Sequence, residues 1–130
     1  MLSAKLALAA VALAGAAAAA GDPGCNKVGE RQVYDCALKA RDAADKDLNE
    51  AYRQAMAVQE DEQAQAKLKA AERIWLQFRD AECTFEDAIF EGGKIETEVN
   101  NLCVAQLTRD RTAQLRRYLA CQKDAMKCAE

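Results

Sequence analysis

The chain gathers its rarest residues in the segment Trp75-Leu76-Gln77-Phe78-Arg79-Asp80-Ala81-Glu82-Cys83. This segment holds the only tryptophan, one of three phenylalanines and one of six cysteines. At helical spacing Trp75, Phe78 and Phe85 share one face, and Arg79 and Cys83 lie along its edge. A large aromatic residue beside an arginine and a cysteine predicts a helix that is packed, ion-paired and cross-linked at one place.

The sequence on both sides of this segment is typical of helices. From about Val33 to Phe90 it contains neither glycine nor proline and is rich in alanine, glutamate, glutamine, lysine and leucine. A first apolar stripe comprises Leu38, Ala44, Leu48, Ala51, Tyr52, Ala55 and Val58. A second comprises Ala64, Leu68, Ala71, Trp75, Phe78, Phe85 and Ile89. One helix across both would be too long for a small domain, so a break is predicted at Gln59-Glu60-Asp61-Glu62, with Asp61 as N-cap.

A glycine pair marks the end of the second predicted helix. The segment Glu91-Gly92-Gly93-Lys94 places glycine in the C-cap region, and a third helix is expected from about Glu96 to Ala120. Three helices joined by short connections predict an all-α fold, an antiparallel three-helix bundle running up, down and up. Its core should be rich in alanine and poor in aromatic residues.

The six cysteines predict that this bundle is stapled by disulfides. Their number is even, and in a small exported chain disulfides are the usual use of cysteine. Six cysteines allow 15 connectivities. The end of the second helix and the start of the third meet at the glycine loop, which favours the pair Cys83–Cys103. Closeness in the sequence favours the pairs Cys25–Cys36 and Cys121–Cys128. The last pair requires the third helix to end by about Cys121.

The start of the chain predicts export. One lysine precedes an uncharged run from Leu6 to Ala20, and small residues stand before Gly21, as in a secretory signal peptide. The run is mostly alanine and is shorter than the ~20 residues of a membrane-spanning helix. We therefore expect a signal peptide over residues 1–20 and one helical domain over 21–130, with a short C-terminal extension from about 121. The expected location is the bacterial periplasm or the medium, with no attachment to a membrane after cleavage.

Charge and composition argue against several classes of function. The chain has 18 basic and 21 acidic residues and a formal net charge of −3, which disfavours a nucleic-acid binder. It has no histidine, no glycine-rich phosphate loop, no G-x-S-x-G turn and no close cysteine pair of the zinc-binding kind. We expect no enzyme activity, no metal and no cofactor. An acidic chain suits a cationic protein partner.

Two charged residues interrupt apolar stripes. Asp45 stands seven residues from both Leu38 and Tyr52, and Arg111 stands four residues from both Leu107 and Leu115. An unpaired buried charge is costly, so each should have a partner. We interpret these charges as a structural network of ion pairs between helices, in preference to a functional polar site. Its expected members are Asp45, Arg79 and Arg111, joined by Asn49.

A cluster of acidic residues surrounds the glycine pair. The candidate binding surface consists of Glu86, Asp87, Glu91, Gly92, Gly93 and Lys94, and it continues into Glu82, Glu96 and Glu98. The glycines permit a tight, protruding turn, and the carboxylates could steer a cationic protein toward it. A solvated helix end explains the charges equally well.

Taken together, these motifs resemble the LprI-type lysozyme inhibitor family. The matching residues are Cys25, Cys36, Ala44-Asp45, Leu48-Asn49, Tyr52, Trp75-Leu76, Phe78-Arg79-Asp80, Cys83, Gly92-Gly93, Cys103, Leu107-Thr108, Arg111-Thr112 and Leu115. The resemblance implies an exported helical domain with structural disulfides and, for some members, inhibition of lysozyme. The sequence departs from the family in having no convincing lipid-attachment site and in adding Cys121 and Cys128. We expect a protein that binds and inhibits a cell-wall-cleaving glycosidase such as lysozyme; a periplasmic structural or adaptor module is the alternative.

Overall fold

The computed structural model of the protein describes residue 25 and residues 29–93, 95–122 and 124–128. The signal peptide predicted over residues 1–20 lies outside the described residues, and so does Lys94. Within the described ranges, none of the helices combines the length and the apolar character needed to cross a bilayer.

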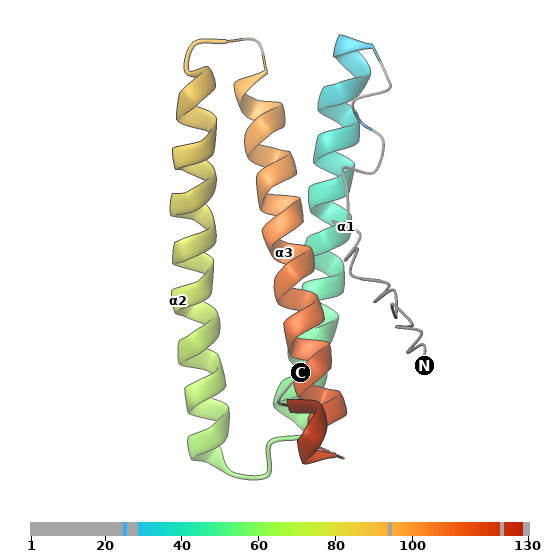
Figure 1. The fold of residues 1–130 in the computed structure, drawn as a ribbon, viewed down its shortest axis with the longest axis vertical. Helices are drawn as coiled ribbons and strands as arrows, with labels where there is room; N and C mark the ends of the chain where they lie inside the picture. The colour runs from blue at the N-terminus through green and yellow to red at the C-terminus, as the bar shows by residue number, and fades with distance from the viewer. Residues whose placement is uncertain (1–24, 26–28, 94, 123, 129–130) are drawn as a thin grey trace, which may run out of the picture.

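Three long helices make up the fold (Figure 1). They are α1 (Glu30–Ala57), α2 (Glu62–Asp87) and α3 (Glu96–Cys121), and the short 3-10 helices η2 (Ala88–Phe90) and η3 (Ala125–Cys128) follow α2 and α3. The described part of the chain contains no strand. The prediction of an all-α three-helix bundle is confirmed.

The helices run up, down and up, so that α2 is antiparallel to both α1 and α3 (Figure 1). In that view α3 lies between the other two helices. It packs extensively along α1 and more sparsely against α2. The connection between α2 and α3 and the beginning of α1 therefore lie at one end of the bundle, and the connection between α1 and α2 lies at the other.

Asp61 begins α2 as the sequence predicted. Its Oδ1 atom accepts hydrogen bonds from the backbone N–H groups of Gln63 and Ala64, at 2.6 Å and 3.3 Å. These are two of the donors that a helix start leaves unsatisfied. The side chain of Gln65 donates to the carbonyl oxygen of Gln59 at 3.0 Å and holds the end of α1 against the start of α2. Side chains thus enforce a helix break that contains neither glycine nor proline.

The main hydrophobic core lies where all three helices meet. Leu48, Ala51 and Ala55 of α1 are buried against Leu115 of α3, and the partly buried residues packed around them are Tyr52, Leu68, Trp75 and Leu119. The small alanine side chains let α1 and α3 approach closely. A second cluster contains Cys83, Cys103, Val104 and Leu107 and lies nearer the connection between α2 and α3.

The predicted second stripe packs only in part. Leu68 and Trp75 join the core, whereas Phe78, Phe85 and Ile89 are 52%, 67% and 74% exposed. The residues that α2 buries are instead Glu72, Arg79 and Cys83. The ion pairs of Glu72 and Arg79 and the disulfide of Cys83 set the rotation of this helix, so that Phe78 and Phe85 face solvent. The expectation that Phe78 and Phe85 pack with Trp75 is therefore wrong.

Arg79 is the first of two buried arginines that connect the helices. Its Nη1 atom lies 3.2 Å from Asp45 Oδ1 on α1 and donates to Thr108 Oγ1 on α3 at 3.3 Å. Its Nη2 atom lies 2.9 Å from Asp80 Oδ1. One guanidinium thus joins all three helices. Asn49, expected to be a further member of this network, is exposed.

Arg111 forms a second ion pair that is separate from the first. Its Nε atom lies 2.9 Å from Glu72 Oε2, and the two side chains are only 7% and 10% exposed. A further hydrogen bond joins its Nη1 atom to Gln114. The guanidinium carbons of Arg79 and Arg111 lie 5.4 Å and 6.0 Å from the centre of the Trp75 ring. Arg111 therefore pairs with Glu72 instead of Asp45, and Glu72 is a partner that the sequence analysis did not identify.

Three disulfides staple the bundle. They join Cys25 to Cys36, Cys83 to Cys103 and Cys121 to Cys128, with Cα–Cα distances of 5.5 Å, 5.6 Å and 4.9 Å. The middle one ties α2 to α3. The last one is possible because α3 ends at Cys121, as the sequence predicted, since seven helical residues would span ~10 Å.

The buried pair predicts unequal costs for removing two acidic residues. Replacing Glu72 by alanine leaves the Arg111 charge buried and should lower the free energy of unfolding by ~3–5 kcal/mol. Asp45→Ala should cost only about 1 kcal/mol, because the Asp45 side chain is 39% exposed and Arg79 keeps Asp80. Urea denaturation followed by circular dichroism measures both, with the exposed Asp47→Ala as control. Equal losses for the two variants would contradict this assignment.

The disulfide between α2 and α3 should matter more than the C-terminal one. It closes a separation of 20 residues, against 7 for Cys121–Cys128, and both of its cysteines are buried. Replacing Cys83 and Cys103 together by alanine should cost ~3 kcal/mol. The matched double substitution of Cys121 and Cys128 should cost less, because it frees only the end of the chain. The reverse order in a urea titration would show that α2 is held by other contacts.

Candidate functional site

The acidic tip, defined as Glu86, Asp87, Glu91, Gly92, Gly93 and Lys94, lies at the end of α2 and in the connection to α3. Glu86 and Glu91 are exposed, as are both glycines, and Asp87 is half-buried. Lys94 lies outside the described residues. The structure therefore brings five of the six predicted residues to one end of the bundle.

Both glycines are required by the shape of the tip. Gly92 has φ 74°, a left-handed conformation that other residues rarely adopt. Gly93 donates its N–H to the carbonyl oxygen of Phe90 at 2.7 Å, and a Cβ atom at Gly93 would lie only 2.7 Å from that same oxygen. The N–H of Gly92 donates to Glu96 Oε2 at 3.1 Å. These contacts define the conformation of the turn.

The acidic residues of the tip differ in their roles. Asp87 accepts a hydrogen bond from Asn100 Nδ2 at 2.5 Å, which connects the end of α2 to the second turn of α3. Glu96, which continues the acidic cluster, is engaged by the turn itself. Glu86 and Glu91 remain exposed to solvent. The negative charge offered to a partner comes chiefly from these two carboxylates.

Apolar residues at the tip were missed by the sequence analysis. Ile89, Phe90 and Ile95 are 74%, 39% and 48% exposed, and they lie between the acidic residues along the chain. The sequence analysis assigned Ile89 to the packed stripe. The short helix η2 interrupts the helical period after Asp87, and nothing in the residue types of Ala88 to Phe90 indicates this interruption. Exposed apolar residues with a charged rim are typical of protein interaction sites.

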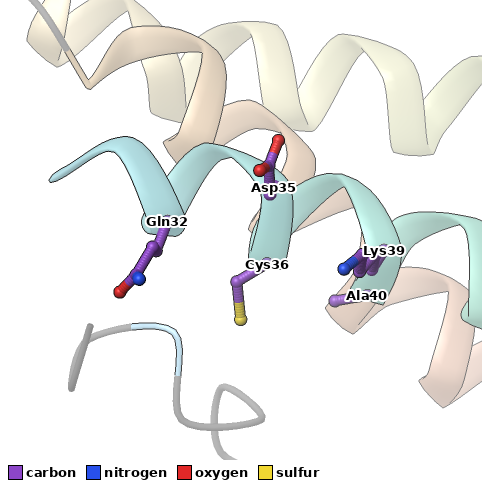
Figure 2. A pocket seen from close by; sticks show the side chains of 5 residues that line it. All are labelled: Gln32, Asp35, Cys36, Lys39 and Ala40. Atoms are coloured by element: carbon purple, nitrogen blue, oxygen red, sulfur yellow. The ribbon is translucent and has the colours of Figure 1, made fainter. Parts of the chain in front are cut away.

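Two surface hollows elsewhere offer less chemistry. One of about 430 Å³ near the start of α1 is lined by Gln32, Asp35, Cys36, Lys39 and Ala40, all from one helix (Figure 2). The sulfur of Cys36 belongs to a disulfide, and the one acid and one base are exposed. Among the described residues that line this hollow, no pair of groups is arranged for acid–base or nucleophilic chemistry.

The second hollow, of about 460 Å³, lies between α2 and α3 and includes Trp75, Asp110, Arg111 and Arg117. Arg111 is already occupied by Glu72, and Trp75 already contacts two guanidinium groups. Across the described residues, no group of three or more histidine, cysteine, aspartate or glutamate side chains could hold a metal ion. The acidic tip remains the candidate interaction surface.

Comparison with known proteins places the chain in a family. The model of the family described as lysozyme inhibitor LprI matches residues 25–115. A protein of Rhizobium meliloti (strain 1021), described as uncharacterized protein R02472, is 32% identical over 111 residues, which is 75% of this chain and 80% of that protein. No solved structure matches. The family match covers α1, α2, most of α3 and two of the three disulfides, and the chain therefore belongs to the LprI lysozyme inhibitor family.

Proposed function

We propose that this protein binds and inhibits a cell-wall-cleaving glycosidase of the lysozyme class. The observation that carries the proposal is the family match over residues 25–115. A helical bundle cross-linked by three disulfides is a rigid scaffold suited to presenting a binding surface. In this proposal the protein blocks the enzyme sterically and performs no chemistry itself.

The acidic tip is the proposed contact surface. Ile89, Phe90 and Ile95 would supply apolar contact area, and Glu86 and Glu91 would supply negative charge around it. The formal net charge of −3 would steer a cationic lysozyme toward the protein, with an association rate that falls as salt rises. Lys94 belongs to the proposed surface by its place in the sequence.

The primary test is a cell-wall lysis assay with purified protein and a cationic lysozyme. We expect lysis to fall with increasing molar ratio of protein to enzyme and to stop at saturation. Unchanged lysis at large molar excess would favour the alternative of a structural or adaptor module.

Two variants locate the surface. Glu86→Gln combined with Glu91→Gln should slow association several-fold and flatten its salt dependence; Asp87 is left intact because it holds Asn100. Ile95→Ser should speed dissociation about tenfold, a loss of ~1.4 kcal/mol, while serine still suits the N-cap position of α3. Surface plasmon resonance against immobilised lysozyme measures both.

The matched control is Asp42→Asn with Asp47→Asn, which removes two exposed carboxylates from α1 and leaves the tip unchanged. If this control slows association as much as the tip variant, net charge alone explains the steering. If Ile95→Ser dissociates like the parent, the contact lies elsewhere.

We also propose that residues 1–20 are a signal peptide and that the protein acts in the periplasm or medium. The uncharged run from Leu6 to Ala20 and the three disulfides support this. Mass spectrometry of the protein purified from a bacterial periplasmic fraction should show an N-terminus at Gly21. An intact N-terminus in the cytosolic fraction would contradict export.

A further inference from the structure

A stripe of exposed apolar residues runs along α2 on the side turned away from its buried contacts. It consists of Ala71, Ile74, Phe78, Ala81 and Phe85, and all five are exposed. The three large side chains Ile74, Phe78 and Phe85 are 65%, 52% and 67% exposed. Monomeric proteins rarely leave a contiguous row of this kind in water.

The spacing of the stripe is that of a coiled-coil seam. Its members follow one another at steps of three, four, three and four residues, the period of 3.5 that keeps one face of a helix against a partner helix. The face that packs on α3 is a different one and carries Glu72, Arg79 and Cys83. Helix α2 therefore has two faces for packing, and the bundle uses one of them.

We propose that the stripe packs against the same stripe of a second copy of this chain, with the two α2 helices antiparallel. The proposed two-fold axis passes midway between Phe78 and Ala81 of each helix. Phe78 then faces the small Ala81 of the partner subunit at the centre of the seam, and Ile74 faces Phe85 of the partner subunit on either side. The small alanine gives the phenylalanine room, and the larger side chains on either side supply most of the apolar contact.

The charges of α2 select a second copy in the antiparallel orientation. The exposed basic residues Lys67, Lys69 and Arg73 follow the exposed Glu62 in its N-terminal half, whereas the exposed Glu86 lies in its last turn and Glu91 follows just after η2. Antiparallel packing brings each basic half beside the acidic end of the other copy. A parallel pair would place like charges together, and a cationic lysozyme on this stripe would meet the basic half.

The area available fits a reversible dimer. A phenylalanine buries ~150–250 Å² when it is fully covered, and the three large residues are only 52–67% exposed in the single chain. Two copies meeting along them would therefore bury less than about 1,000 Å² from these side chains, as in weak and transient interfaces. The dimer should therefore dissociate on dilution. The stripe ends at Phe85, next to Glu86 of the acidic tip, so the two proposed surfaces adjoin and share Glu86 and Glu91.

Sedimentation equilibrium of the purified protein over a wide concentration range tests the proposal. The average mass should rise from that of one chain toward that of two chains. Phe78→Glu and Phe85→Glu should each weaken dimerisation about 100-fold or more, because a charge would be buried in the seam. Both residues are exposed in the single chain, so circular dichroism should show an unchanged helical spectrum.

The control is Ala66→Glu, which adds the same charge to an exposed position of α2 outside the seam and should dimerise like the parent.

The orientation is tested by Gln77→Lys and Thr84→Glu. These positions flank the seam, and in the antiparallel pair each new lysine lies beside a new glutamate of the other copy. The double variant should therefore dimerise several-fold more tightly than either single variant.

Several outcomes would overturn the proposal. A parent protein of single-chain mass at every concentration would exclude self-association, and a stripe used by lysozyme would then show as lost inhibition in Phe78→Glu. Dimers that persist in Phe78→Glu and Phe85→Glu would place the interface on another surface. A double variant that is no tighter than the single variants would exclude the antiparallel pairing. Inhibition of lysozyme by a parent protein that stays monomeric at every concentration would overturn this inference and leave the proposed function standing.

Discussion

Two arginines buried between the helices are the constraint on which the rest of this structure depends. A guanidinium cannot be buried without compensation, so Arg79 takes Asp45 and Asp80, and Arg111 takes Glu72. These partners come from α1 and α2, and meeting them fixes how α2 is rotated against its neighbours. The rotation that satisfies the charges is also the one that exposes Phe78 and Phe85. The pairing of the buried charges thus determines which apolar residues are left on the surface.

The sequence was sufficient to predict the three helices and the two breaks between them. Asp61 and the pair Gly92-Gly93 act through local geometry, one by accepting backbone hydrogen bonds and the other by allowing a left-handed turn, and local geometry can be read from residue types. The partners of the buried charges could not be predicted in the same way. Glu72 stands beside the exposed Arg73 and resembles an ordinary surface residue. Only the relative rotation of α2 and α3, a property of the whole bundle, shows that it faces Arg111.

The same limit applies to the candidate site. The charges and glycines of the tip were recognisable, because acidic residues and a glycine pair stand out in a sequence. Its apolar component was not, since Ile89 continues the helical spacing of a stripe that was expected to be buried. The exposure of Ile89 and Ile95 follows from where α2 stops and from how the turn is held by Glu96 and Asp87. The tip and the stripe of α2 are therefore two surfaces produced by one helix orientation.

The position of Trp75 has a spectroscopic consequence. It is the only tryptophan of the chain, it touches the core formed by all three helices, and the two buried guanidinium groups lie close to its ring. Intrinsic fluorescence excited selectively at tryptophan therefore reports from a single site at the junction of α1, α2 and α3. Separation of α2 from α3 would withdraw Arg111 from the indole, whereas Arg79 stays on the same helix as Trp75, and it would admit water, changing both the intensity and the wavelength of emission. The emission of Trp75 therefore reports the packing of α2 against α3 without an added fluorescent label.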